Sequence, residues 1–537
     1  MGYDREKIID NVRALMQIEN DVAKSYDDFP YESYALKETH PSHIYTIATL
    51  YGFKPTLIDR ANVLELGCAS GGNIIPMAFH LPNARFCGID LSKKQIELGK
   101  RLIEDLQLKN ISLIHQSILD FNPLEKFDYI ICHGLYSWVD ANIREKILEI
   151  CKNQLTATGI AYISYNTFPG WEIAGTVRDM LLLYTAAEKN PLHKATTARS
   201  LLMHLFTQLK NMTTPYSALV IQEVEILLKH SDAQLIHEHL SNTNEPFYFH
   251  QFMQAANKYD LHFLAEAFLS NMKTENLPAE YTVAPKNEEN RILAGQYMDF
   301  VKNRRFRATL LCHERLIIQE KNIQEAIWKC YLRLVVLPDN DNFQENDILT
   351  PKEILFTNSI MCLNVNDPFS KLVMWILFQA KEKSLHYSEL CKSIMQNVPQ
   401  SFSEIQVFLD KLLLKAILGG IIDVNVVSPH YVLEVTDKPL ACPFARYQVY
   451  YQNIVTNRRH ENIQLTHLAQ ALLPYLDGAH DIKALIQVIN DFVEEGALLI
   501  VDENNQPVND EQKKFLQIEM LCKKTLNQLA NQAILIR

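Results

Sequence analysis

Two acidic residues and two glycines occur at a spacing that can hold a nucleoside-containing ligand. Glu65, Gly67 and Gly71 lie where an apolar run of strand type gives way to small residues and a helix-forming segment. Such a strand–turn–helix junction presents backbone N–H groups to a polar ligand. Asp90 ends the next apolar run, one strand–helix–strand interval further along, where an acid can accept both hydroxyls of a ribose. The pattern predicts a nucleoside site; the alternative is an ordinary α/β turn, because glycines also end strands for structural reasons.

The turn differs from one that binds a dinucleotide. A pyrophosphate site requires G-x-G-x-x-G, in which glycines let the backbone approach the phosphates, whereas Ala69 stands here at the middle glycine. Glu65 precedes the glycines, and an acid beside the ligand suits a cation better than a diphosphate. The pattern E-x-G-x-x-x-G-G, followed by G-I-D-L-S at residues 88–92, resembles the S-adenosylmethionine site of class I methyltransferases. That cofactor carries a sulfonium and an ammonium and no phosphate, so the resemblance implies S-adenosylmethionine as the cofactor.

A parallel sheet is needed to bring these residues to one edge. Apolar runs and amphipathic segments alternate as far as residue 165, and such alternation predicts a parallel sheet covered on both faces. The predicted strands are 63–66, 86–90, 111–115, 127–132 and 160–165, with helices at 92–105 and 140–152. From 171 to about 240 the pattern is helical only, and strand-like runs return at 261–267 and 306–312. We expect these two runs to complete the same sheet, with the helical block as an insertion.

The remainder of the chain has a different organisation. Three predicted helices at 371–381, 387–395 and 402–416, with a hairpin of Gly419–Val427 and His430–Val435, resemble a winged-helix module. A generic α+β packing domain is the alternative. The third helix is not basic, so partner or substrate binding is favoured over DNA binding. The expected regions are a core with an N-terminal helical arm (1–170), a helical insertion (171–245), the completion of the core sheet (246–315), a winged-helix-like domain (316–440) and a mainly helical C-terminal region (441–537).

The resemblance to a family becomes specific in two segments, residues 133–139 and 162–171, which follow the fourth and fifth predicted strands. They resemble bacterial class I methyltransferases with a methyltransferase regulatory domain, a group that includes the rickettsial outer-membrane-protein lysine methyltransferases. The resemblance implies an α/β fold with a Rossmann-like seven-stranded sheet, a helical insertion and a C-terminal α+β region. Further matches, which extend it over nearly the whole chain, are 26–31, 237–240, 296–300, 305–307 and 476–478.

The resemblance implies cofactor-binding roles for the positions that match the class I pattern. At the methionine end these are Glu65, Gly67, Gly71 and His133, and along the ribose and adenine they are Asp90, Leu91, Ser117 and Ile118. An aromatic segment before the first strand contains Tyr26 and Tyr31. We expect these two tyrosines to form a lid over the adenosine; the alternative is an arm that packs against the domain.

The chemistry of methylation indicates what the acceptor side must provide. A lysine with a pKa near about 10.4 is neutral in only about one molecule in 10³ at neutral pH. Desolvation among aromatic rings lowers that pKa, and the rings attract the ammonium. The expected acceptor-side residues are His133 as a base, Asn166, and an aromatic wall of Tyr136, Trp138, Tyr165, Phe168 and Trp171. Core packing is the alternative for each aromatic residue, and His133 has the alternative role of orienting the cofactor.

Charge, cysteine spacing and hydropathy bear on nucleic-acid binding, metal binding and cellular location. The chain of 537 residues carries a net charge of −11, so no global basic field attracts nucleic acid. Its 10 cysteines include no C-x-x-C pair and no tight Cys/His cluster, which predicts a reducing compartment and no metal site. The charged N-terminus lacks the apolar stretch of a signal peptide, and the most apolar run, 412–422, is too short to span a bilayer. We therefore expect a cytoplasmic protein without a membrane span.

These observations lead to one leading hypothesis and two alternatives. We expect an S-adenosylmethionine-dependent methyltransferase that acts on lysine side chains of a protein, and the resemblance implies an outer-membrane protein as substrate. Amide or exocyclic-base methylation is disfavoured, because residues 132–135 replace the [N/D]-P-P-[Y/F] turn of those enzymes. The alternatives are a small-molecule methyltransferase and a cofactor-binding regulatory protein without turnover. A dimer is one option for the oligomeric state.

Overall fold

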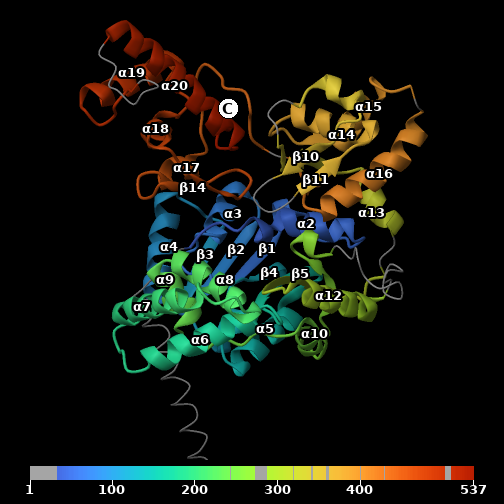
Figure 1. The fold of residues 1–537 in the computed structure, drawn as a ribbon, viewed down its shortest axis with the longest axis vertical. Coiled ribbons are helices and arrows are strands. Elements are labelled where there is room, and N and C mark those ends of the chain that lie inside the picture. Colours follow the sequence, from blue (N-terminus) through green and yellow to red (C-terminus); the bar gives the residue numbers. More distant parts are fainter. Residues whose placement is uncertain are drawn as a thin grey trace, which may run out of the picture. The chain divides into compact units, whose positions relative to one another are not determined.

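The chain folds as two compact units (Figure 1). The first unit holds, among the described residues, 33, 51–78 and 82–317, and the second holds 34–50, 79–81 and the described residues from 320 onward. The computed structural model describes residues 33–241, 243–272, 287–317, 320–339, 343–357, 362–399, 401–428, 430–501 and 510–537.

The first unit is built on one seven-stranded sheet. Its strand order is β3-β2-β1-β4-β5-β7-β6. The strands are β1 (Asn62–Leu66), β2 (Arg85–Asp90), β3 (Ile111–His115), β4 (Phe127–Cys132), β5 (Leu155–Asn166), β6 (His262–Glu266) and β7 (Phe306–Cys312). The first five pair in parallel, whereas β7 runs antiparallel to both β5 and β6. The predicted seven-stranded sheet, completed by two strands from far along the chain, is confirmed.

The composition of the strands follows from their burial. Every residue of β4 is buried, as expected of a parallel strand covered on both faces.

The helices of this sheet are α3 (Ile74–His80), α4 (Lys93–Asp105), α5 (Ala141–Gln154), α10 (Phe249–Asn257) and α12 (Glu288–Lys302). Ser92 caps α4, since its hydroxyl accepts from the N–H of Gln95. The cap places the start of α4 directly after the acid that ends β2.

A buried ionic cluster holds the antiparallel edge of the sheet together. Arg307 of β7 donates from Nη1 to Glu266 Oε1 of β6 at 2.5 Å and from Nε to Asp299 Oδ2 of α12 at 2.9 Å. Its guanidinium also lies 3.7 Å from the centre of the Phe249 ring in α10. All three charged side chains are almost fully buried. The cluster therefore links the last two strands to the two helices that pack on them.

The insertion between β5 and α10 is helical, as predicted. It contains α6 (Trp171–Thr185), α7 (Pro191–Leu209), α8 (Pro215–Lys229), α9 (Asp232–Gln234) and a π-helical turn (Leu235–His239). These helices share their own apolar core. Arg305, just before β7, forms an ion pair of 2.7 Å with Glu223 of α8, so the insertion is tied back to the sheet.

The second unit contains the three predicted helices, observed as α14 (Pro368–Gln379), α15 (Tyr387–Met395) and α16 (Phe402–Leu418). The predicted hairpin is wrong. The run at 422–425 forms β13 (Ile422–Asn425), which pairs antiparallel with β8 (Tyr331–Leu334), and residues 430–435 form no strand. The first run finds its partner in an earlier strand instead of the segment that follows it. The remaining strands here are β9 (Leu337–Pro338), β10 (Ile354–Thr357), β11 (Cys362–Val365) and β12 (Leu385–His386).

Residues 34–50, assigned to the core region from the sequence, pack in the second unit. Lys37 Nζ lies 2.6 Å from Asp423 Oδ2, and the Asn462 side chain donates to the carbonyl of Ala35. The helix of this segment is α2 (Pro41–Leu50), which packs on α13 (Glu320–Ile327) and β13. The C-terminal part of the unit has α17 (Pro443–Gln448), β14 (Ile454–Thr456), β15 (Asn462–Gln464), α18 (His467–Leu472), α19 (Ile482–Glu494) and α20 (Glu511–Asn531).

Within the described ranges, no helix combines the length and the apolar composition needed to cross a bilayer.

Candidate functional site

The glycine turn after β1 has a backbone shape that requires glycine. Gly67 and Gly71 have φ angles of +74° and +81°, which place them in the left-handed region that glycine tolerates best. The N–H groups of Gly67 and Cys68 both donate to the carbonyl of Ile89, at 2.9 and 3.0 Å. A Cβ on Gly72 would lie 2.0 Å from the carbonyl oxygen of Ser33. The turn is thus folded against the end of β2.

The Asp90 carboxylate holds this turn from the neighbouring strand. Its Oδ2 accepts from the N–H of Ala69 and its Oδ1 from the N–H of Ser92, both at 2.8 Å. Burial raises the pKa of Asp90, while these N–H donors act against the shift. An ionised carboxylate offers about four acceptor positions, so further acceptor capacity remains beyond the two backbone bonds. Asp90 can therefore position the turn and also accept ribose hydroxyls.

Glu65 provides an acidic group inside the site. Its Oε1 accepts from the side-chain amide of Asn73 at 2.6 Å, while its Oε2 is buried and has no hydrogen-bond partner among the described residues. Burial raises the pKa of Glu65 to about 8, and the nearby Asp90 charge adds to the effect. A cation beside Oε2 would satisfy the orphaned oxygen and reverse the shift. The residues present therefore fit the positively charged end of S-adenosylmethionine.

The residues expected along the adenine lie at the ends of adjacent strands. Asp90 of β2 pairs with His115 of β3 in the sheet, so Leu91 and Ser117 follow neighbouring strand ends. His115 Nε2 lies 3.0 Å from the carbonyl oxygen of Leu91. Ser117 caps the short 3₁₀ turn that starts at Ile118, accepting from the N–H of Leu119. The structure brings Leu91, Ser117 and Ile118 to the same edge of the sheet as the glycine turn.

His133 follows β4 and is held by β5. Its Nδ1 lies 2.9 Å from the hydroxyl of Tyr162, and the next N–H, that of Gly134, donates to Ser164. Burial lowers the pKa of His133 to about 4, so the ring is neutral at pH 7 and is a weak base. A Cβ on Gly134 would meet no described heavy atom within 4 Å. This geometry favours orientation of a ligand by His133 over removal of a proton.

Tyr136 and Tyr165 belong to the hydrophobic core, which corrects their expected place in an acceptor wall. Their exposed fractions are 3 % and 1 %. The Tyr165 ring stacks on Phe252 of α10 at a centroid distance of 4.1 Å, and the edge of Tyr136 meets the same ring at 5.3 Å. The Tyr165 hydroxyl lies 3.1 Å from that of Thr309 in β7. Both rings therefore pack in the core of the first unit against α10.

Asn166, the last residue of β5, connects two loops. Its N–H donates to the hydroxyl of Ser137, and its side-chain amide donates to Asn244 Oδ1 at 2.9 Å. The side chain is buried. These bonds show Asn166 joining the loop after β4 to the segment before α10, which is a positioning arrangement.

The remaining aromatic residues of the expected wall follow the ends of β4 and β5, and their place on the acceptor side stays a prediction. Trp138 is half-buried and meets Trp171, at the start of α6, edge to face with centroids 6.2 Å apart. Phe168 is half-buried and packs against Tyr248 at 5.2 Å. The Trp171 ring is buried; it also lies nearly parallel to His239 of the insertion, with centroids 5.8 Å apart and an angle of 18°, and the Arg305 guanidinium lies 5.9 Å from its centre. We name Trp138, Phe168 and Trp171 the aromatic wall.

Some site residues were not identified from the sequence. Asn73, which holds Glu65, directly follows the paired glycines, and an amide at the start of a helix was an available signal. Tyr248 is distant in sequence from Phe168, against which it packs, and no local pattern marks it as a site residue. The expected lid residues Tyr26 and Tyr31 lie outside the described residues, so the lid stays a prediction.

Family models match three parts of the chain. A methyltransferase domain matches residues 58–267, a predicted methyltransferase regulatory domain matches residues 231–313, and the C-terminal winged helix domain of PKMT matches residues 437–534. The winged-helix match therefore lies in the region expected to be mainly helical, beyond the residues at which the sequence suggested such a module.

Similar proteins cover almost the whole chain. An uncharacterised protein of Rickettsia prowazekii is 35% identical over 99% of this chain and 98% of its own length. The solved structure of PKMT2 from Rickettsia typhi in complex with AdoHcy is 29% identical, covers 95% of this chain and 100% of that one, and superposes with a TM-score of 0.85. The chain belongs to the S-adenosylmethionine-dependent class I methyltransferases that carry a methyltransferase regulatory domain and a PKMT-type winged helix domain.

Proposed function

We propose that this methyltransferase N-methylates lysine side chains of a protein substrate, with an outer-membrane protein as the expected class. The observation that carries the proposal is the full-length likeness to PKMT2 of Rickettsia typhi, with a TM-score of 0.85, rather than to the catalytic domain alone. The aromatic wall supports it, because Trp138 is half-buried and an aromatic ring attracts an ammonium.

The proposed mechanism depends on alignment and desolvation. S-adenosylmethionine supplies an electrophilic methyl group when bound. Glu65 would face the positive end of the cofactor, and Asp90 would accept its ribose hydroxyls while it holds the turn at Ala69. The aromatic wall would exclude water from the lysine and lower its pKa, so that Nζ gives its proton to bulk solvent as the lysine enters and is held there as the neutral amine. His133, neutral at pH 7 because burial lowers its pKa to about 4, would orient the reactants.

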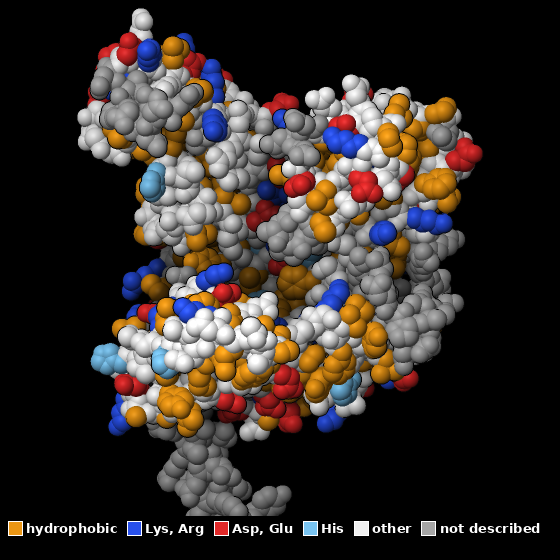
Figure 2. Space-filling view, viewed as in Figure 1, with side chains coloured by type: hydrophobic (Ala, Val, Ile, Leu, Met, Phe, Trp, Pro, Cys, Tyr) orange, Lys and Arg blue, Asp and Glu red, His pale blue; other side chains and the backbone are white. Residues whose placement is uncertain are grey.

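An exposed apolar surface in the first unit supports a protein rather than a small-molecule substrate. Four side chains on one side of α12 are exposed: Leu293, Tyr297, Phe300 and Val301. Figure 2 shows hydrophobic side chains gathered over α10 and α12. A large substrate needs contacts beyond the reacting lysine to bind in register. We propose this surface, defined by the four α12 residues, as part of the substrate-binding region.

Transfer of a labelled methyl group tests the proposed function. The full-length protein is incubated with labelled S-adenosylmethionine and either a bacterial lysate or a purified outer-membrane protein, with Asp90→Asn as the inactive control. Label on protein that mass spectrometry places on lysine Nζ would support the proposal. Label only in the small-molecule fraction would favour the small-molecule alternative. Cofactor binding without any label in either fraction would favour the regulatory alternative.

A further inference from the structure

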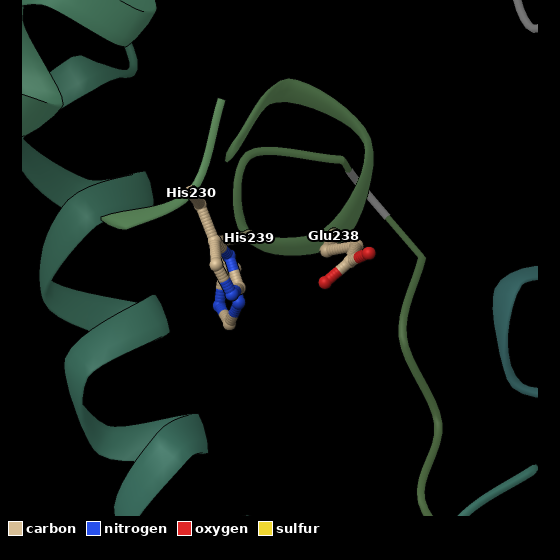
Figure 3. A group of neighbouring side chains, drawn as sticks. All are labelled: His230, Glu238 and His239. Atoms are coloured by element: carbon tan, nitrogen blue, oxygen red, sulfur yellow. The ribbon is translucent and has the colours of Figure 1, made fainter. Parts of the chain in front are cut away.

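Three potential metal ligands meet in the helical insertion, close to the aromatic wall. His230 directly follows α8, and Glu238 and His239 lie in the π-helical turn Leu235–His239. One ligand atom from each residue lies within 4.8 Å of those of the other two. Figure 3 shows the three side chains on the same side of the turn, with one Glu238 oxygen directed toward the histidines. Single π-helical turns inside helices occur frequently at functional sites.

Two of these residues have an unexplained buried nitrogen. The Nδ1 atoms of His230 and His239 are buried and have no hydrogen-bond partner among the described residues. The exposed fraction of His239 is only 2 %. A buried polar atom without a partner is destabilising, and a bound ion is one of the accepted reasons for its presence. The two nitrogens are therefore candidate ligand atoms for an ion.

The chemistry of the three groups selects the kind of ligand. Two imidazoles and one carboxylate form a common ligand set of zinc sites, in which a fourth position is left for water. Tetrahedral coordination with bonds of about 2.0–2.2 Å would place the ligand atoms about 3.4 Å apart, somewhat closer than the 4.8 Å limit within which they lie. Glu238 and His230 are only half-buried, so side-chain rotation can close the difference.

The surrounding charges are compatible with a cation because the positive groups are engaged. Arg305 lies near His239 but forms an ion pair with Glu223 through both carboxylate oxygens, at 2.7 and 2.8 Å. Arg178 donates to the carbonyl of Ser241 at 2.5 Å. Each arginine still opposes a cation to some extent, which makes the Glu238 carboxylate essential for affinity.

We propose that His230, Glu238 and His239 form a binding site for a divalent transition-metal ion of the zinc class. The ion joins the end of α8 to the π-helical turn, and the carbonyl of His230 is already held by Arg199 at 2.6 Å. Because His239 lies parallel to Trp171, and Trp171 meets Trp138, bound metal also fixes the position of the aromatic wall. The site thus couples the insertion to the acceptor side.

Metal titration of the untagged, chelator-treated, full-length protein tests the site. Calorimetry with Zn²⁺ is expected to show one tight site per chain, and Co²⁺ is expected to give the visible absorption of a tetrahedral nitrogen–oxygen site. His230→Asn and Glu238→Gln should each weaken Zn²⁺ binding by at least about tenfold, because each removes a ligand. His204→Asn, which changes an exposed histidine of α7, is the matched control and should bind as the wild type does.

The outcomes test metal binding and its coupling to the aromatic wall separately. Glu238→Gln keeps the side-chain size, and circular dichroism confirms that each variant is folded before titration. Zn²⁺ binding that is unchanged in both ligand variants, or weakened equally by His204→Asn, would overturn the site. Zn²⁺ should also change the intrinsic tryptophan fluorescence, and Trp171→Phe should remove that change. Binding without a fluorescence change from Trp171 would overturn the coupling to the aromatic wall.

Discussion

The carboxylate of Asp90 lies 2.8 Å from the backbone nitrogen of Ala69, so the acid at the end of β2 holds the glycine turn that follows β1. A ribose-binding acid is expected to act on the ligand alone, yet Asp90 also determines the shape of the turn around the ligand. The same carboxylate reaches the start of α4 through the N–H of Ser92. Changes at Asp90 should therefore affect cofactor binding in two ways.

Asp90→Asn should weaken the binding of S-adenosylhomocysteine by at least about tenfold. The amide has one acceptor oxygen and no charge, and hydrogen bonds to charged groups contribute about 1.5–3 kcal/mol each. Calorimetry measures the change, with Glu104→Gln on the exposed side of α4 as the control. An affinity equal to that of the wild type would contradict the assignment of Asp90 to the cofactor site.

Cofactor binding should release protons from Glu65. Because burial raises the pKa of Glu65 to about 8, the carboxyl is mostly protonated at pH 7 in the free protein. A bound cation favours the ionised form, so the pKa falls, a proton leaves, and affinity rises with pH until about 8. Calorimetry in buffers of different ionisation enthalpy measures this release. It should vanish in Glu65→Gln, and its absence in the wild type would mean that Glu65 does not face a cation.

Trp138→Ala should lower turnover, whereas Tyr165→Phe should lower stability and leave turnover unchanged. Loss of Trp138 should lower kcat by about thirtyfold with little change in cofactor affinity, because a desolvated cation–π contact with the charge that develops on Nζ in the transition state contributes about 2 kcal/mol. Tyr165→Phe removes only the hydroxyl beside Thr309; it should cost about 1 kcal/mol of stability and leave kcat unchanged. Steady-state kinetics with thermal unfolding checks both. A large loss of kcat in Tyr165→Phe would instead support the first expectation, that Tyr165 belongs to the acceptor side.

Asp299→Ala should strongly destabilise the first unit. The substitution leaves Arg307 buried with one carboxylate instead of two, and breaking a buried ion pair typically costs about 3–5 kcal/mol. Scanning calorimetry should show a lower Tm for the unfolding transition of the first unit. That transition is recognised because added cofactor raises its Tm, since ligand binding stabilises only the unit that holds the ligand. Glu289→Ala, at an exposed position of α12, should leave that transition in place. Equal stability of the two variants would mean that the cluster does not hold the sheet edge.

A chain that ends at residue 319 should be poorly soluble. The truncation removes α13 and β13, on which α2 packs, and leaves the buried side chains of Ile44, Ile47 and Leu50 without that cover. It also removes Asp423, the partner of Lys37. Soluble yield and cofactor binding, compared with the full-length protein, measure the effect. A soluble truncated chain with normal cofactor affinity would show that residues 34–50 do not need the rest of the second unit.

The sequence by itself determined the features that depend on local pattern. The alternation of apolar runs with amphipathic segments predicted the sheet, including its last strands at 261–267 and 306–312, because burial on both faces demands such runs. The glycine turn and Asp90 were also recognisable, since a left-handed backbone and a strand-end acid leave a signature at fixed spacing. The proposed metal-ligand group was missed, because Glu238 and His239 lie in a turn whose π-helical geometry, which brings them near His230, leaves no such signature.

Only the tertiary structure decided which way side chains point and which distant segments meet. Tyr136 and Trp138 are two residues apart, yet the first lies under α10 in the core and the second faces Trp171. Residues 34–50 pack with strands and helices nearly 400 positions away, as the contact between Lys37 and Asp423 shows. Such outcomes depend on the total burial and pairing that the whole fold can achieve, and no short stretch of sequence contains that information.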